Sequence, residues 1–465
     1  MNRINPEWMS TLVDLPKIRV HFLGYSLIFD VFRDPCVSSL FPRGNKRYNQ
    51  SWNGGVMKYT FHTDTDPAVM DQFVIHSDQN SLYQTHEWAA LKDNWNSAFV
   101  SVRDENNEIA ATALVLIRRL VMNKTLIYIP RGPVMDWHNE ELVRFMLDSL
   151  KEFGKKHHAV DVRFDPNVIY KKYPFADKDL PQEPMNTEVI EFLKAYGAKH
   201  RGFTTMISES TQPRYNVVMK IDQDWESRLI KNTRQSIRTA VKRGAEVHEG
   251  REYIPELAEA LHATETRKHV ALRNAEYFEH MADVYGDHSL IMVAELDFNK
   301  EIERLEQERA EIEQQLQKET AVKKQNQLNL RLENIAKDLE LTEQWRNEEG
   351  RDKAVLCGKM VCFNEKRMEF FYMGNNTKYM RIRANYLLYS KCLQRCADLN
   401  IPVCSFGGVD GTLDDGIAMF KSAWPVEIEE YIGEFNIVLD PAAYQLFEKV
   451  YPKILEAAVR LRSRG

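Results

Sequence analysis

Ser289-Leu-Ile-Met-Val-Ala-Glu295 and Ala354-Val-Leu-Cys-Gly-Lys-Met-Val-Cys-Phe363 are two apolar stretches typical of buried strands, and they enclose a segment of a different kind. The enclosed segment, Asn299 to Glu349, contains no Gly and no Pro. Its apolar residues form one narrow seam in each half, with heptad-like spacing: Ile302, Leu305, Ile312 and Leu316, then Leu328, Leu332, Ile335, Leu339 and Thr342. We therefore predict an antiparallel helical hairpin of the coiled-coil type, inserted between two strands.

The two seams are separated by a polar tip at residues 318 to 326. Arms of about 20 residues, at ~1.5 Å rise per residue, give a hairpin about 30 Å long. Such short arms are insufficient for a dimerisation coiled coil unless each arm packs against the other. We expect a hairpin that packs within one chain.

Length and composition are those of an ordinary globular protein. The chain has 465 residues, of which 43% are hydrophobic and 11% aromatic, so two or three domains with cores of their own are expected. The formal net charge is −6, and the hairpin contributes nine Lys/Arg against thirteen Asp/Glu. The remainder is nearly balanced, so contact with a nucleic acid must come from a local patch.

The cysteines and the apolar runs bear on the compartment. The six cysteines form no CxxC pair and have no histidine at a metal-ligand spacing, so buried thiols, a reducing cytoplasm and no structural metal are expected. The apolar run at residues 20–32 is too short to span a bilayer and too interrupted for a signal peptide. We predict no transmembrane helix.

Strand and helix patterns alternate from Met57 onward, which predicts mixed sheets in two packed α/β units. The predicted strands are 57–61, 99–103, 109–118, 125–129, 160–164, 214–220, 289–295, 354–363, 368–373, 403–407 and 437–439. The predicted helices are 66–75, 81–94, 139–153, 187–196, 225–243, 253–268, 383–399 and a closing helix to Arg462.

The same patterns predict the domain bounds. Residues 1–56 form an atypical extension: either Met57 is the biological start, or the extension is poorly packed. Residues 57–209, completed by 432–465, form the first subdomain. Residues 210–431 form the second, with the hairpin of residues 299–349 within it.

Six short stretches, in this order along the chain, match a family pattern. They are Gln84-Thr-His-Glu-Trp-Ala-Ala-Leu-Lys-Asp-Asn-Trp95, Arg131-Gly-Pro-Val-Met-Asp136, Val162-Arg-Phe-Asp-Pro166, Pro213-Arg-Tyr-Asn216, Ser405-Phe-Gly-Gly408 and Glu430-Tyr-Ile-Gly-Glu434. From Met57 to the C-terminus the chain resembles the Fem-type aminoacyltransferases, the FemA/FemB/FemX and MurM/MurN group that builds peptidoglycan side branches.

This resemblance implies a fold and an activity. The implied fold is α/β (α+β), with twin acetyltransferase-like subdomains and a helical arm at the place of the hairpin. The implied donor is aminoacyl-tRNA, and the implied acceptor is a peptidoglycan precursor, lipid II or UDP-MurNAc-pentapeptide. We expect a cytoplasmic monomer without cofactor or metal, which contacts the inner membrane leaflet if the acceptor is lipid II.

Phe420 and Lys421, in Met419-Phe-Lys-Ser-Ala-Trp424, match the Phe-Lys pair that meets the tRNA acceptor end in the family. A phenylalanine ring can stack on the terminal adenine, and a lysine can face a phosphate or the oxyanion at the ester carbonyl. A core Phe beside a solvent Lys is the alternative. Because the ester is already activated, orientation and charge stabilisation can supply most of the catalysis.

Lys92, Arg273, Tyr277 and Tyr372 fall on the family's acceptor-binding positions. Lys and Arg suit a diphosphate, and tyrosine hydroxyls suit sugar and peptide oxygens. Arg273 departs in its neighbours, since it stands in Leu272-Arg-Asn274 where the family often has His-Arg-Pro. Asp165 either accepts a proton from the attacking amine or caps a turn.

A basic stripe recurs along a predicted helix that ends at Gly244. Its members are Lys231, Arg234, Arg238 and Lys242. Such a stripe can track RNA phosphates, and it can equally be a solvated helix face. Since the hairpin is acidic, its tip at Lys323-Lys324 is a better candidate for RNA contact than its shaft.

Two other readings are open. An acetyl-CoA-dependent N-acetyltransferase needs a glycine-rich turn whose backbone amides hold a pyrophosphate, and Arg381-Ile-Arg-Ala-Asn385 has no glycine at the corresponding junction. A non-catalytic RNA or coiled-coil interaction protein would use the hairpin but would not explain the six matching stretches.

Overall fold

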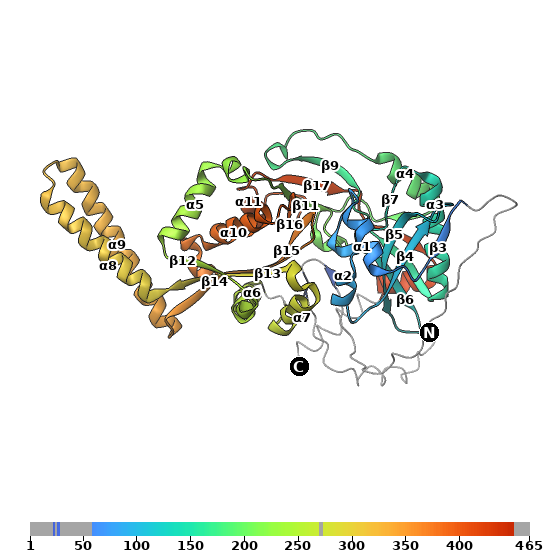
Figure 1. The fold of residues 1–465 in the computed structure, drawn as a ribbon, viewed down its shortest axis with the longest axis horizontal. Helices are drawn as coiled ribbons and strands as arrows, with labels where there is room; N and C mark the ends of the chain where they lie inside the picture. Colours follow the sequence, from blue (N-terminus) through green and yellow to red (C-terminus); the bar gives the residue numbers. More distant parts are fainter. Residues whose placement is uncertain (1–21, 24–25, 28–57, 269–272, 451–465) are drawn as a thin grey trace, which may run out of the picture. The chain divides into compact units, whose positions relative to one another are not determined.

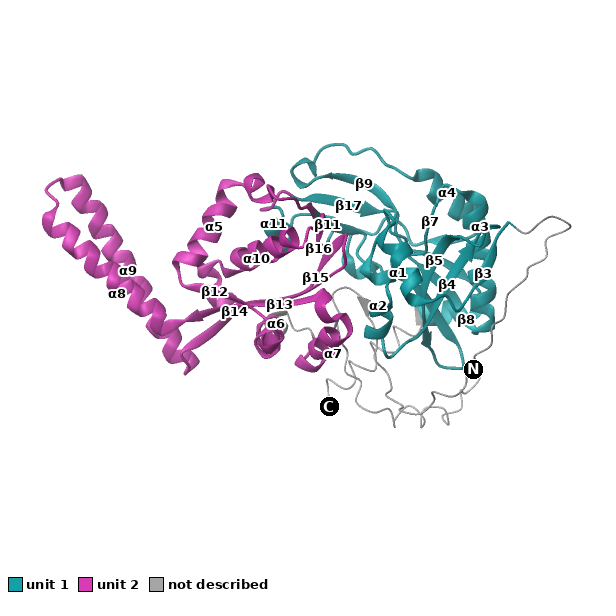
Figure 2. Ribbon diagram, viewed as in Figure 1, with its two compact units in different colours: residues 1–218, 407–422, 426–465 teal, residues 219–406, 423–425 magenta. Residues whose placement is uncertain are grey.

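The computed structural model describes residues 22–23, 26–27, 58–268 and 273–450. Its contacts divide the chain into two compact units (Figure 2): residues 1–218, 407–422 and 426–465 form unit 1, and residues 219–406 and 423–425 form unit 2. The domain bounds inferred from the sequence remain predictions. Most of the atypical extension, including Met57, lies outside the described residues, although two short strands, β1 (Phe22–Leu23) and β2 (Ser26–Leu27), pair within it.

Unit 1 is built on a mixed sheet with the order β10-β18-β8-β6-β5-β4-β3, in which β7 also pairs with β5. Only β6 and β8 are parallel among these pairs, and the helix α3 (Glu140–Lys156) lies between them in the chain. The strands are β3 (Thr60–His62), β4 (Asn96–Arg103), β5 (Ile109–Arg119), β6 (Thr125–Ile129), β7 (Val134–Met135), β8 (Ala159–Phe164), β10 (Lys199–His200) and β18 (Phe435–Val438).

The helices α3 and α4 (Thr187–Tyr196) pack apolar faces on this sheet. In α3 the buried residues Leu142, Met146 and Leu150 recur every four positions and belong to one core cluster with the sheet residues. Gly197 ends α4 at φ +102°, a conformation that favours glycine. The other helices are α1 (Pro67–Ile75), α2 (His86–Leu91), α11 (Gly416–Lys421) and α12 (Pro441–Gln445).

Three further strands lie wholly or largely in unit 1. β17 (Glu427–Tyr431) pairs antiparallel with β9 (Ile169–Pro174) on one side and with β11 (Tyr215–Lys220) on the other. The division between the units falls inside β11 and inside β16 (Val403–Val409).

Unit 2 contains the strands β12 (Ala245–Glu249), β13 (Ser289–Asp297), β14 (Lys353–Phe363) and β15 (Arg367–Asn375), paired antiparallel in chain order. β15 pairs with β16 in parallel, and α10 (Ala384–Asp398) connects them.

The remaining helices of the unit 2 body are α5 (Lys231–Lys242), α6 (Ile254–Lys268) and α7 (Ala275–Tyr285). The backbone of α6 approaches β15 so closely that a Cβ at Gly374 would lie 2.3 Å from the backbone nitrogen of Leu261. A side chain at this position would force the helix off the strand.

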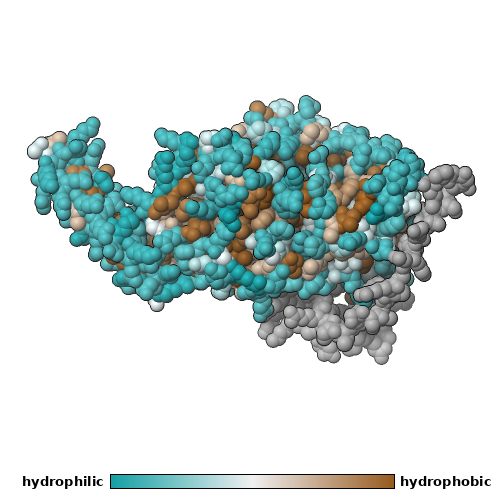
Figure 3. Space-filling view, viewed as in Figure 1, coloured by the Kyte–Doolittle hydropathy of each residue, from teal (hydrophilic) through white to brown (hydrophobic). Residues whose placement is uncertain are grey.

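The predicted hairpin is confirmed. α8 (Phe298–Lys318) and α9 (Val322–Glu349) run side by side from the β13–β14 pair (Figure 1). Both predicted seams meet in one apolar cluster. Leu305, Ile312, Leu328, Ile335 and Leu339 are buried in it, and Ile302, Leu316 and Leu332 pack against it. The face of the hairpin seen in Figure 3 is otherwise mainly hydrophilic.

Most predicted elements are present, with three differences in helices. The stretch 81–94 is a 3-10 turn followed by the short α2, and the stretch 225–243 is a 3-10 helix at Trp225–Arg228 followed by α5. The closing helix is α12 followed by a π-helical turn, Leu446–Val450, and its predicted remainder lies outside the described residues. Neither α7 nor α11 was predicted.

The cysteines within the described ranges are buried and free, as predicted: Cys357, Cys362, Cys392, Cys396 and Cys404. Of the helices that the structure describes, none combines the length and the apolar character needed to cross a membrane.

Candidate active site

Lys421 is the last residue of α11 in unit 1. Asp415 caps this helix by accepting a hydrogen bond from the backbone nitrogen of Ala418 at 2.8 Å. Lys421 is only 5% exposed, and its Nζ donates to the carbonyl oxygens of Gly407 at 2.9 Å and Gly408 at 3.0 Å. Two acceptors on consecutive residues hold the ammonium in one place.

The two glycines make this acceptor pair possible. Gly407 has φ +79°, which is unfavourable for other residues, and a Cβ on Gly408 would lie 2.4 Å from Pro213. The Ser405-Phe-Gly-Gly408 motif therefore ends in a close backbone turn whose carbonyl groups face Lys421. Phe420, half-buried, precedes Lys421 in the same helix.

Asp165 lies at the end of β8 and is 4% exposed. It accepts hydrogen bonds from the hydroxyl of Tyr128 at 2.8 Å and from the backbone nitrogen of Arg131 at 2.6 Å. Burial raises the pKa of Asp165 to about 7, although the neighbouring Arg131 opposes this shift. Each carboxylate oxygen accepts one hydrogen bond. This geometry is that of a turn cap, one of the two roles that the sequence allows for Asp165.

Arg131 was not singled out as a site residue, although its motif was. Its backbone is left-handed, with φ +53°, and Asp165 supports this conformation. The guanidinium donates to the carbonyl oxygen of Pro213 at 2.6 Å and lies 4.2 Å from the ring centroid of Tyr431. The sequence does not show that this arginine is buried at a turn, because that depends on partners that are distant in the chain.

The matching stretches meet one another within unit 1. Arg214 of the Pro213 motif bonds Glu430 of the last motif at 2.6 Å, and both side chains are buried. Glu434 of that same motif accepts from the backbone nitrogen of Thr211 at 2.8 Å. The carbonyl oxygen of Pro213 accepts the hydrogen bond from Arg131, and its ring packs so closely on Gly408 that a Cβ there would lie 2.4 Å from it. Five of the six stretches thus form a connected network.

Three of the four predicted acceptor-binding residues cluster in unit 2. The hydroxyl groups of Tyr277 and Tyr372 lie 3.1 Å apart, and the guanidinium of Arg273 lies 4.4 Å from the ring centroid of Tyr277. Burial and the neighbouring Tyr372 raise the pKa of Tyr277 well above its usual value. The buried Nε of Arg273 has no hydrogen-bond partner in the described part of the chain.

The fourth acceptor residue, Lys92, is the C-cap of α2 in unit 1, where its Nζ lies 4.5 Å from the ring centroid of Trp88. The structure does not place it relative to Arg273, because the two residues belong to different units.

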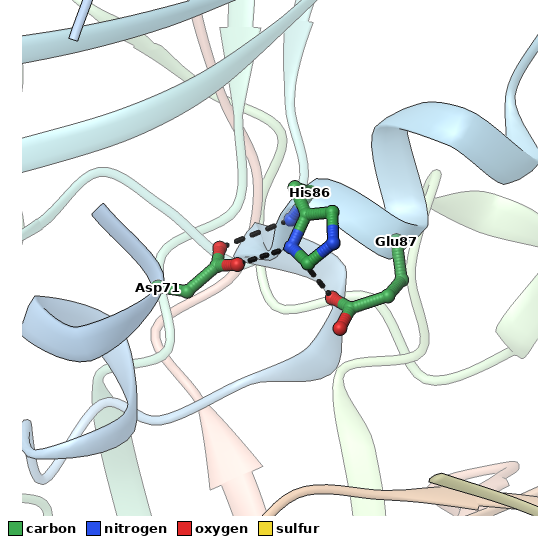
Figure 4. A group of neighbouring side chains, drawn as sticks. All are labelled: Asp71, His86 and Glu87. Atoms are coloured by element: carbon green, nitrogen blue, oxygen red, sulfur yellow. Dashed lines mark hydrogen bonds and ion pairs between the residues drawn. The ribbon is translucent and has the colours of Figure 1, made fainter. Parts of the chain in front are cut away.

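A group of three possible metal ligands lies at the start of α2: His86 and Glu87 of α2, and Asp71 of α1 (Figure 4). Their donor atoms lie within 4.8 Å of one another. Asp71 accepts from the backbone nitrogen of His86 at 3.0 Å and contacts its Nδ1. These bonds attach the start of α2 to α1. The sequence did not indicate this group, because Asp71 and His86 are 15 residues apart.

The basic stripe is present on α5, where Lys231, Arg234, Arg238 and Lys242 are all exposed. Lys242 differs from the others because it bonds Glu308 of the hairpin at 3.1 Å.

The comparisons with known proteins agree with this architecture. A sequence model described as the FemAB family matches residues 65–452. The chain is similar to lipid II:glycine glycyltransferases of Staphylococcus aureus, from strain MRSA252 and from bovine strain RF122 / ET3-1. Each is 28% identical over 418 residues, which cover 84% of this chain and 96% of the relative.

The solved structure of FemX matches with a TM-score of 0.65 and 24% identity, covering 84% of this chain and 100% of FemX. This likeness confirms the predicted α/β fold class. The match of the family model, which extends over most of the chain, also confirms the resemblance noted from the six stretches. The chain belongs to the FemAB family.

Proposed function

We propose that this protein transfers an amino acid from aminoacyl-tRNA to an amine of the stem peptide of a peptidoglycan precursor, and so builds the interpeptide bridge. The amine attacks the ester carbonyl, an amide bond forms, the ester C–O bond breaks, and the tRNA leaves with its hydroxyl group restored. The acceptor is lipid II or its UDP-linked precursor. The similarity to lipid II:glycine glycyltransferases over 84% of the chain supports this class of acceptor.

The observation that carries the proposal is the fixed position of Lys421. Two carbonyl oxygens hold the ammonium of Lys421, the residue that follows Phe420. The lysine side chain therefore needs little reorganisation when negative charge develops on the ester carbonyl. In this proposal Phe420 stacks on the terminal adenine of the donor. Asp165 acts by holding the Arg131 turn, since both of its oxygens are already engaged.

Substrate binding is assigned to the remaining residues. Arg273 offers an unused donor to the acceptor, Tyr277 and Tyr372 offer hydroxyl groups, and Lys92 offers a charge for a phosphate. The α5 stripe binds the tRNA backbone. We further propose a cytoplasmic monomer that needs no cofactor and that contacts the membrane only where its acceptor is lipid-linked.

A reconstituted assay tests the reaction. Purified protein, mixed charged tRNAs and either lipid II or UDP-MurNAc-pentapeptide should give an acceptor whose mass increases by one amino-acid residue. Treatment with ribonuclease should abolish the product. A product formed from acetyl-CoA without tRNA would instead establish the acetyltransferase alternative.

The acceptor assignment has its own test. Y277F removes one hydroxyl of the Tyr277–Tyr372 pair, and a hydrogen bond of about 1 kcal/mol corresponds to roughly a fivefold change in binding. We expect the KM for the acceptor to rise by about this factor while kcat and the KM for charged tRNA stay the same. A selective rise in the tRNA KM would contradict the assignment.

A further inference from the structure

The four cations of the α5 stripe are not equivalent, and the hairpin is the cause. Lys231, Arg234 and Arg238 form no ion pair within the described ranges. At the C-terminal end of α5, Lys242 bonds Glu308 of α8, and Arg243 lies 3.8 Å from Asp338 of α9. The stripe thus has an open part and a part occupied by hairpin carboxylates.

The occupied part extends beyond α5. Asp338 also pairs with Arg381, at 2.9 Å, so one carboxylate faces two arginines. Glu308 forms ion pairs with Arg304 at 3.0 Å and with Arg331 at 3.3 Å, in addition to Lys242. Both carboxylates are largely shielded, with 17% and 27% of their side chains exposed. Burial opposes a low pKa for Glu308, yet the bonds from Lys242 and Arg304 outweigh it and lower the pKa.

The backbone fixes this arrangement. α5 ends at Lys242. Gly244, two residues further on, has a φ of +73°, and a Cβ there would lie 2.8 Å from the carboxylate of Glu301 on α8. The chain therefore turns directly against the base of the hairpin, and the acids of α8 and α9 come to the end of the stripe. All of these residues belong to unit 2.

We propose that Glu308 and Asp338 act as an electrostatic stop for RNA: by occupying Lys242, Arg243 and Arg381, they confine tRNA phosphates to the Lys231–Arg238 part of α5. A carboxylate between two guanidinium groups takes the place that a phosphate would take. The inference rests on the proposed tRNA donor. In this proposal the hairpin limits the surface to which the RNA binds and does not itself bind the RNA.

The test measures the affinity of an uncharged tRNA transcript between 50 and 200 mM salt. In E308Q/D338N the three cations become available, so the slope of log K against log salt should steepen by up to about 0.7–0.9 for each new phosphate contact. At low salt the affinity should rise by roughly tenfold. An unchanged slope, or weaker binding, would overturn the proposal.

A matched control separates this local effect from the general change in charge. E313Q/E333Q makes the same change of charge on the same two helices, at exposed positions away from the α5 pairs. It should alter the affinity by less than about twofold. An equal gain in both double variants would mean that long-range attraction alone is responsible, which would also overturn the proposal.

A second pair of variants does not disturb the hairpin acids. R243Q/R381Q removes cations that are already occupied and should change the affinity little, whereas R234Q/R238Q removes open ones and should weaken binding by at least tenfold. If R234Q/R238Q has no effect, the proposed tRNA site on α5 fails. If it weakens binding but R243Q/R381Q does so equally, only the electrostatic stop fails. Circular dichroism should verify that each variant keeps its helices.

Discussion

Two lysines, one in each unit, are almost completely buried, and they are buried in opposite ways. Lys421 of α11, 5% exposed, donates to the carbonyl oxygens of Gly407 and Gly408. Lys359 of β14, 1% exposed, lies between two aromatic rings, with Nζ 3.9 Å from the centroid of Phe370 and 3.6 Å from that of Tyr389. Burial lowers the pKa of Lys359 to about 8.

Burial is therefore common to both lysines, and the difference between them lies in their partners. Two backbone carbonyl oxygens accept hydrogen bonds from the ammonium of Lys421 and so fix its position. Phe420 precedes Lys421 in the same helix. Aromatic faces stabilise the ammonium of Lys359, and its other neighbours include buried thiols such as Cys392. We therefore assign chemistry to the first lysine and packing to the second.

The largest effect is expected from removing Lys421. K421M should lower kcat by about 10²–10³, the cost typical of losing one group that stabilises an oxyanion, with little change in the tRNA KM. The assay of amino-acid transfer described above measures this. Thermal unfolding should verify that K421M folds, and K359M is the matched lysine-to-methionine control. Near-normal turnover in folded K421M would remove the assigned role.

Replacing Lys359 should act on stability. K359M has nearly the same volume and no buried charge, so we expect the free energy of unfolding to rise by roughly 1–2 kcal/mol near pH 7. Because the pKa of Lys359 is lower in the folded protein, its unfavourable contribution is fully present below about pH 8 and fades as the pH rises toward 10.5. The gain in K359M should shrink over this range, as urea unfolding at pH 7 and pH 10 would show.

If K359M loses turnover as severely as K421M, the distinction between the two lysines is wrong. If K359M is instead less stable than the wild type, the aromatic rings stabilise the ammonium of Lys359 by more than its desolvation costs.

The smallest effect concerns Asp165, a buried acid of unit 1. Its pKa of about 7 lies above the usual 3.8, so its favourable contribution to stability is full below pH 3.8 and is lost as the pH rises through 7. D165N removes this titration. We expect wild-type unfolding free energy to fall from pH 5.5 to pH 6.5 by about 1 kcal/mol more than that of D165N.

The same variant sharpens the assignment of Asp165. A cap that holds Arg131 should tolerate Asn with a loss of turnover below about tenfold, because the amide still offers one acceptor. A loss of more than 100-fold in a folded protein would indicate that Asp165 takes the proton of the attacking amine.

Local patterns in the sequence determined much of the fold. The period of the seams from Ile302 to Thr342 predicted the hairpin and the faces that meet in it, because heptad spacing and helix geometry are properties of neighbouring residues. Apolar runs of strand length predicted β4, β5, β13 and β14 in the same way. The motifs indicated the family before any contact was known.

Only the tertiary structure decided how charges are partnered. Nothing near Lys421 in the chain indicates that Gly407 and Gly408 hold it, and the helical spacing of the α5 stripe does not reveal that Glu308 pairs with Lys242. Arg131, Asp165 and Pro213 come together from stretches more than 30 residues apart. Spacing along a helix follows from local geometry, whereas the partner of a buried or paired charge depends on which distant segments the fold brings within a few ångströms.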